Sequence, residues 1–166
     1  MILSDDAKRF AIAREVERAK TVSYLTNGAI LPLLIGVGYL FSRIINKKFM
    51  LLKGPPRIRL QMYAIVLPIV AYASIFLEDL NSYYIEGLID SRACMLGIGY
   101  SKGGVEYYDK QLKSNIAMRT LNRVNGKDTY NLHGNPWPSL FRPYKYRCPT
   151  LRKEMCQELL ASANTI

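Results

Sequence analysis

The sequence predicts an all-α integral membrane protein, in which a two-helix transmembrane hairpin is followed by a small helical region outside the membrane. Residues 21–42 and 60–77 contain no charged side chain. As helices rising about 1.5 Å per residue they would extend roughly 33 and 27 Å, close to the roughly 30 Å hydrocarbon thickness of a bilayer. The alternative is a pair of buried helices in a soluble core. It is weak, because a chain of 166 residues has too little other apolar sequence to cover both.

Residues 1–20 are predicted to contain an amphipathic helix, from Ala7 to Lys20, that leads into the first span. Its apolar face is formed by Phe10, Ala11, Ala13 and Val16. On the other face, acids lie three positions before bases, which favours a self-neutralised solvated surface. Docking to a partner, or a position in the headgroup plane, is the open alternative. The same acids argue against a secretory signal and against a matrix-targeting presequence.

Residues 21–77 are predicted to form the hairpin, with spans at about 21–45 and 60–77 and a basic loop at 46–59. Small side chains in both spans would let a neighbouring helix come close in lipid. We expect this packing, or the binding of a partner helix, at Gly36, Gly38, Ser42, Ala71 and Ser74. No Asp, Glu, Lys, Arg or His lies in the uncharged stretches, which argues against a proton- or ion-coupled transporter.

The loop and its flanks carry six cations and no acid. Anionic phospholipid headgroups are the partners that such cations would meet first. We expect contacts with headgroups or with a partner at Arg43, Lys47, Lys48, Lys53, Arg57 and Arg59. The net charge is +10, but no nucleic-acid-binding fingerprint accompanies it, so no nucleic acid is expected. The positive-inside rule places the loop on the cytoplasmic or matrix side, although the basic C-terminal region competes for the same side.

Residues 78–126 are predicted to form a helical hairpin outside the membrane. Apolar periodicity favours one helix from about Glu78 to Leu96 and a second from about Gly104 to Leu121. The glycines at 97, 99, 103 and 104 are expected to end the first helix.

Residues 127–166 are predicted to combine an irregular aromatic and basic segment with a short terminal helix. Proline, glycine and asparagine favour irregular structure up to residue 149. Within it, Trp137, Arg142 and Tyr144 suit either a membrane interface or a protein-docking arm. The final helix is expected from Thr150 to Ala163, with Thr150 as its N-cap.

The chain contains no recognisable catalytic constellation. His133 is the only histidine, so the paired histidines of a zinc peptidase are missing, and we expect it to lie in a turn. Glu86 and Asp90 share a helix face at a spacing of four. Without a nucleophile or metal beside them, we expect a solvated acidic face rather than an acid–base pair. The sequence therefore predicts no enzyme, no cofactor and no metal site.

Three cysteines are present, and their odd number argues against a disulfide scaffold. Ordinary reduced thiols are the main expectation, with a bridge between Cys148 and Cys156 as the alternative.

Five segments together resemble one known family. They are residues 10–16 (FAIAREV), 90–93 (DSRA), 103–110 (GGVEYYDK), 115–119 (NIAMR) and 130–135, which ends in Gly-Asn. With these segments, the chain resembles the transmembrane protein 177 family from about Ala7 to Glu158.

Members of that family are multi-pass mitochondrial inner-membrane proteins associated with biogenesis of cytochrome c oxidase subunit 2 and with its inner-membrane chaperone. The resemblance implies a non-catalytic role in assembly or stabilisation, with respiratory-chain subunits or assembly factors as partners besides membrane lipids. It also implies that the chain matches the later part of a longer protein. The alternatives are a permanent accessory subunit of a respiratory complex and a degenerate membrane metallopeptidase-like scaffold.

Overall fold

The computed structural model describes residues 2–50, 54–122, 126–145 and 147–163. The helices in these ranges are α1 (Asp5–Lys20), α2 (Ser23–Lys48), α3 (Pro56–Cys94), α4 (Ile98–Leu121), α5 (Gly126–Thr129) and α6 (Pro149–Ala163). The chain forms two compact units. One is the hairpin unit, Ser23–Ser82, and the other is the helical unit, Met1–Val22 with Tyr83–Ile166.

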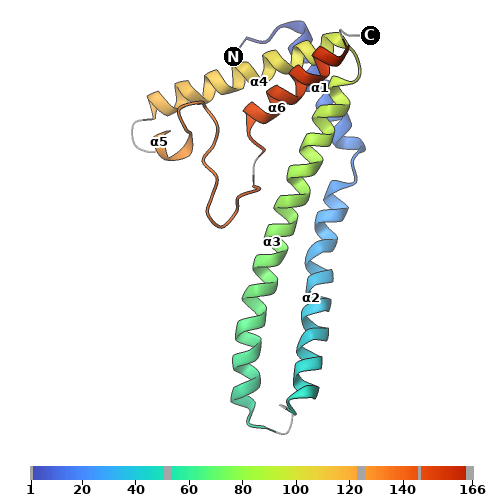
Figure 1. Cartoon of the computed structure of the whole chain (residues 1–166), viewed down its shortest axis with the longest axis vertical. Helices are drawn as coiled ribbons and strands as arrows, with labels where there is room; N and C mark the ends of the chain where they lie inside the picture. Colours follow the sequence, from blue (N-terminus) through green and yellow to red (C-terminus); the bar gives the residue numbers. More distant parts are fainter. Residues whose placement is uncertain (1, 51–53, 123–125, 146, 164–166) are drawn as a thin grey trace. The chain divides into compact units, whose positions relative to one another are not determined.

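The hairpin unit consists of α2 and the first part of α3, which run side by side in opposite directions (Figure 1). Both helices are long and apolar enough to cross a membrane. Only 11% and 6% of the residues in their most apolar stretches are buried. A core helix of a soluble protein would be mostly buried, whereas a lipid-facing helix exposes apolar side chains. The predicted fold class, all-helical with two candidate membrane spans, is therefore confirmed.

Polar side chains join the two helices near both ends of the hairpin. Close to the start of α2, Asn27 donates from Nδ2 to the Ser82 hydroxyl at 3.1 Å, and Asn81 donates to Asn27 Oδ1 at 2.7 Å. Near the loop, Asn46 donates from Nδ2 to the Tyr63 hydroxyl at 3.1 Å. Hydrogen bonds of this kind hold helices together where lipid supplies no hydrophobic drive for association.

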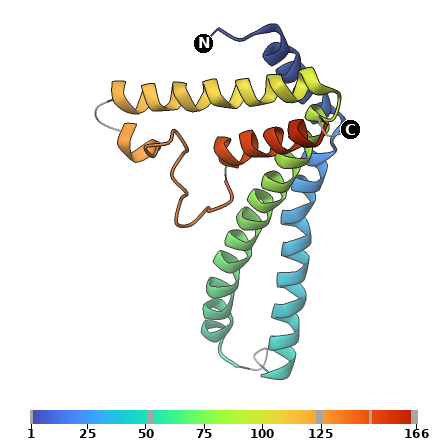
Figure 2. The same cartoon turned by 45° about the horizontal axis from the view of Figure 1, so that its top comes forward.

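In the helical unit, α1 and α6 both pack on α4 (Figure 2). Its apolar centre draws one or two side chains from each of α1, α3, α4 and α6. The fully buried members are Phe10, Ala93, Cys94, Tyr108 and Cys156. Aromatic edges meet ring faces within this centre, since the Phe10 and Tyr108 rings are 5.9 Å apart at 77°.

Helix α4 begins earlier than the sequence predicts, because most of its glycines are packing positions rather than helix stops. Of the four glycines expected to end the preceding helix, Gly97 alone lies at the break, with φ of 152°. Gly99, Gly103 and Gly104 lie inside α4. A Cβ on Gly103 would sit 2.2 Å from the Asp6 carbonyl oxygen, so only glycine lets α1 cross at this distance.

Other helix boundaries also differ from prediction. Helix α2 continues to Lys48 and α3 begins at Pro56, so both helices extend into the expected loop 46–59. The helix expected from about residue 78 is the continuation of α3, because no residue between the apolar stretch and Cys94 breaks it. Helix α1 begins at Asp5, where the Ser4 hydroxyl accepts from the Ala7 amide at 3.2 Å as the N-cap. Thr150 lies inside the first turn of α6 and is not its N-cap, since its hydroxyl bonds to the Asn135 side chain instead.

Candidate functional site

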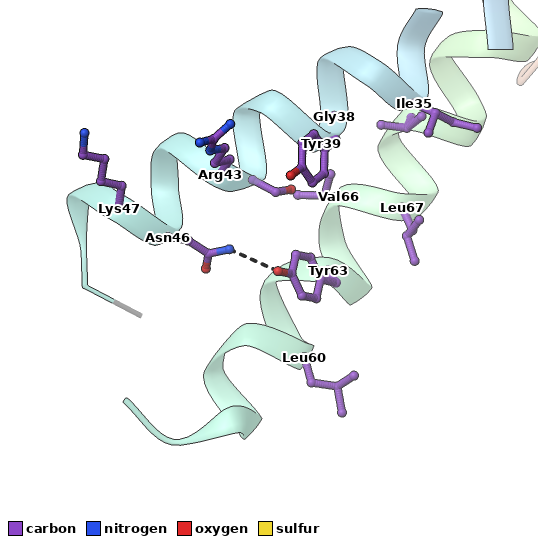
Figure 3. Close-up of a pocket in the computed structure, with 12 residues that line it drawn as sticks. Ile35, Gly38, Tyr39, Arg43, Asn46, Lys47, Leu60, Tyr63, Val66 and Leu67 are labelled. Carbon is purple, nitrogen blue, oxygen red and sulfur yellow. Dashed lines mark hydrogen bonds between the residues drawn. The ribbon is translucent and has the colours of Figure 1, made fainter. Parts of the chain in front are cut away.

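A groove between α2 and α3 lies at the loop end of the hairpin unit (Figure 3). It has a volume of about 840 Å³, which is within the range of small-molecule sites. The α2 residues that line it recur every three or four positions, so they form one face of the helix. The lining side chains are Ile35, Gly38, Tyr39, Ser42, Arg43, Asn46 and Lys47 from α2 and Leu60, Tyr63, Val66, Leu67 and Val70 from α3.

The groove is apolar over most of its length and basic at one end. Arg43 and Lys47, one helical turn apart, supply the charge. No aspartate or glutamate occurs between Glu17 and Glu78 in the sequence. These two cations therefore have no acidic neighbour along α2, the loop or the apolar part of α3, and their charge is available to an anion.

The other predicted loop cations lie outside the groove lining. Lys48 and Arg57 are exposed, and Arg59 is half-buried with an Nε that has no hydrogen-bond partner among the described residues. Lys53 lies outside the described residues.

Asn46 is the polar residue of this groove that sequence reasoning missed. It is only 7% exposed. Its Nδ2 is used by Tyr63, but its Oδ1 is buried and has no donor among the described residues. Buried polar atoms are normally satisfied, and an orphaned one costs roughly 1–3 kcal/mol. Asn46 follows Ser42 by four positions, so it lies on the same face of α2, the one turned toward α3. This spacing is the sequence signal from which Asn46 could have been predicted.

Three of the five small residues predicted for helix packing are packed or buried, and two are open or exposed. A Cβ on Gly38 would lie 2.9 Å from Val70 Cγ2, so α3 closely approaches α2 at this position. Ser42 and Ser74 are buried. Gly36 has open space around it, and Ala71 is exposed.

The helical unit contains a buried ionic cluster, defined here as Arg14, Glu86, Asp90, Tyr108 and Arg152, that joins α1, α3, α4 and α6. Asp90 is fully buried and accepts at Oδ1 from Arg14 Nε (3.0 Å), the Tyr108 hydroxyl (2.8 Å) and an Arg152 terminal nitrogen (2.7 Å). Its Oδ2 accepts from Arg152 Nε at 2.5 Å. The expectation of a solvated acidic face at Glu86 and Asp90 is therefore wrong, because guanidinium groups from two other helices cover it.

Glu86 completes the charge balance of this ionic cluster. Arg14 and Arg152 each donate to Glu86 Oε2, at 2.7 and 2.8 Å, and Arg18 donates to Oε1 at 2.6 Å. Burial by itself would raise the pKa of Glu86, but the positive charges of Arg152, Arg14 and Arg18 outweigh it and hold that pKa below its usual value. Burial raises the pKa of Tyr108, so its hydroxyl keeps its proton and donates to Asp90.

The cysteines do not form the bridge that the sequence left open as an alternative. Cys94 and Cys156 are buried, with their Sγ atoms 2.9 Å apart, and Cys148 is only half-buried. All three are free thiols, so a Cys148–Cys156 bridge is not formed. The hydrogen bond with Cys94, together with burial, raises the pKa of Cys156 above the usual thiol value. A protonated, buried thiol is a poor nucleophile.

The predicted aromatic and basic contacts lie on the irregular segment between α5 and α6. Trp137 is exposed, and its indole nitrogen donates to the Lys127 carbonyl at 3.0 Å. The Tyr144 ring meets the Tyr83 ring edge-on at 5.7 Å, and Arg142 is exposed. His133 lies in a turn, where its amide donates to Asn131 Oδ1 at 2.9 Å. Within the ranges that the structure describes, no three His, Cys, Asp or Glu residues are grouped to hold a metal.

Curated relatives match almost the whole chain. It is 27% identical to transmembrane protein 177 of Danio rerio over 164 residues, which is 99% of this chain and 53% of the relative. It is 32% identical to the Homo sapiens protein of that name over 154 residues, 89% of this chain and 49% of the relative. The Rattus norvegicus protein is 33% identical over 140 residues, 83% of this chain and 44% of the relative.

The chain thus spans about half the length of these relatives. No protein-family model matches it, and no solved structure gives a significant match. The sequence matches bear out the resemblance found in its motifs: over most of its length, this chain is a membrane-protein homologue of the transmembrane protein 177 of vertebrates.

Proposed function

We propose that this chain is a non-catalytic protein of the mitochondrial inner membrane that helps to assemble or stabilise a respiratory-chain component. By its family resemblance, that component is cytochrome c oxidase subunit 2 at the stage of its biogenesis. The apolar hairpin anchors the protein in the membrane, and the helical unit presents a folded surface to a partner outside it.

The proposal rests on one observation: within the buried ionic cluster, the Asp90 carboxylate is fully occupied by hydrogen bonds from the protein itself. Asp90 is the most deeply buried acid described, and four hydrogen bonds from three helices occupy it. A general acid or base needs a free site within reach of a substrate. Asp90 offers none, so it serves to lock α1, α3, α4 and α6 together, which suits a scaffold rather than an enzyme.

The outer surface of the helical unit supports a binding role. Leu132, Leu140 and Phe141 are 70% or more exposed on the segment between α5 and α6. Trp137 lies on the same segment, and Arg142 supplies a cation beside Phe141. Exposed aromatic and basic side chains of this kind are typical of partner-binding surfaces. Respiratory-chain subunits and assembly factors of the same membrane are the partners we propose for it.

Affinity purification tests this function directly. The full chain, tagged at one terminus, is recovered from mitochondria in mild detergent, and the bound proteins are identified against an unrelated tagged two-span protein of the same membrane. Enrichment of a respiratory subunit or of an assembly factor is expected. Recovery of neither would refute the proposal.

A native gel separates a transient assembly role from permanent membership of a complex. The proposal predicts that the chain migrates with incomplete complexes and is largely absent from the mature one. Stoichiometric migration with a mature complex would instead establish the accessory-subunit alternative.

A further inference from the structure

The groove in the hairpin unit has the charge distribution of a site for an amphipathic anion. Its basic end, Arg43 and Lys47, lies just beyond the uncharged stretch of α2. Apart from Asn46, the remaining lining residues, among them Ile35, Leu67 and Val70, lie within the two uncharged stretches that are candidate spans. A molecule that fills it must therefore carry negative charge at the loop end and hydrocarbon toward the middle of the span.

The positive end of the groove is not neutralised by the protein itself. The nearest acids along the sequence are Glu17 and Glu78, and neither lies in the loop or beside the lining residues of α2. Two cations one helical turn apart are suited to hold one phosphate, since each ammonium or guanidinium group donates to a different oxygen. Charge complementarity thus selects an anionic phospholipid over a zwitterionic one.

Asn46 adds a requirement for a hydrogen-bond donor. Its Oδ1 is buried in the groove lining without a donor among the described residues, while its Nδ2 is already engaged by Tyr63 (Figure 3). A phosphodiester supplies only acceptors at neutral pH, so it cannot satisfy this oxygen. A hydroxyl on the headgroup can.

We propose that this groove binds one anionic glycerophospholipid whose headgroup carries a free hydroxyl, as in phosphatidylglycerol. Arg43 and Lys47 hold its phosphate, Asn46 Oδ1 accepts from its hydroxyl, and an acyl chain lies along the apolar wall formed by Ile35, Val66 and Val70. This site depends on the hairpin lying in lipid and does not depend on the respiratory role proposed above.

The test is lipid titration of the purified full chain, read by native mass spectrometry in a neutral detergent. Phosphatidylglycerol is expected to bind as one molecule per chain, with phosphatidylcholine much weaker. The double variant Arg43→Gln/Lys47→Gln should weaken phosphatidylglycerol about thirtyfold, because two phosphate contacts are lost. The matched control Lys48→Gln/Arg57→Gln removes the same charge from the same end of the hairpin unit but outside the groove lining, and its affinity should stay close to that of the unmodified chain.

Two further variants test whether the lipid fills the apolar part of the groove and whether its headgroup hydroxyl bonds to Asn46. Val66→Phe places a larger side chain in the groove without changing its charge, so it should also displace the lipid. Far-ultraviolet circular dichroism should show that the helicity of this variant is unchanged. The unmodified chain should prefer phosphatidylglycerol to phosphatidylethanol, an anion without the free hydroxyl, by about fivefold for one hydrogen bond. Asn46→Leu should abolish that preference.

Several results would overturn the proposal. Equal losses in the two double variants would mean general surface attraction, and no loss in either would mean that the cations bind no lipid. Full displacement of the lipid by inorganic phosphate would mean that the acyl chain has no part. Equal binding of phosphatidylglycerol and phosphatidylethanol would remove the role of Asn46.

Discussion

Replacing Asp90 by asparagine should destabilise the helical unit while leaving its shape almost unchanged. The carboxylate is fully buried and receives three hydrogen bonds from guanidinium groups and one from a tyrosine hydroxyl. Asparagine keeps one acceptor but turns an NH₂ group toward a donor of Arg152. Removing one partner of a buried ion pair costs about 3–5 kcal/mol. We expect about 3 kcal/mol, the lower end, because Glu86 still faces both Arg14 and Arg152.

A loss of this size is a large part of the roughly 5–15 kcal/mol that holds a typical domain folded. Chemical denaturation in detergent, followed by circular dichroism, measures it, and limited proteolysis should show α1 and α6 cut earlier than the hairpin helices. Asp109→Asn is the matched control. That acid pairs with Lys113 and Lys153 at a partly exposed site, so its replacement should cost no more than about 1 kcal/mol. Equal effects of the two changes would refute the locking role of Asp90.

Three further predictions follow from the geometry. The pKa of Glu86 in the folded chain is held below its usual value of 4.5. The stability that Glu86 contributes is therefore complete above pH 4.5 and is lost as the pH falls through the lowered folded pKa. The free energy of unfolding should fall less on acidification in Glu86→Gln than in the unmodified chain, and identical pH curves for the two proteins would contradict this. Gly103→Ala should destabilise the helical unit by about 1–3 kcal/mol through a clash with the α1 backbone. Gly99→Ala is the control in the same helix, because its Cβ would lie at an ordinary contact distance, 3.7 Å, from the Asp6 carboxylate; it should be neutral or slightly stabilising in thermal melts. Gly38→Leu should loosen the hairpin and raise protease sensitivity at the loop, because α3 lies against this position, and Gly36→Leu should not, because it faces open space; equal sensitivity would refute the packing role of this face.

The membrane hairpin could be predicted because lipid selects for composition over a continuous stretch. The absence of charge in residues 21–42 and 60–77 is visible without knowing any contact. The same holds for the basic loop and for the pairing of Glu15 with Arg18, whose spacing of three in one helix places them together. Each of these signals is local.

The buried ionic cluster could not be predicted, because its members are far apart in the sequence. Arg14 and Arg152 reach Asp90 across 76 and 62 positions, respectively. Seen along its own helix, Asp90 had only Glu86 and Arg92 as charged neighbours, which suggested a solvated face. Gly103 misled for a related reason. A glycine that ends a helix and one that admits a crossing helix look the same until the crossing helix is placed.

The groove could be predicted only in part. The cations at its end were predicted, but the separation of Arg43 and Lys47 from Lys48 and Arg57 required the facing surface of α3. The orphaned acceptor of Asn46 likewise appears only when both helices are in place. Short-range patterns therefore identified the region, while the specific chemistry depended on helix pairing.

The central claim is that lipid surrounds the two uncharged stretches, and extraction of membranes with alkaline carbonate tests it most directly. This treatment releases proteins that are held at a membrane surface by charge and leaves those whose helices cross the hydrocarbon. We predict that the full chain stays in the membrane pellet, also when Arg43, Lys47, Lys48 and Arg57 are all changed to glutamine. Release of the chain into the soluble fraction would contradict the account.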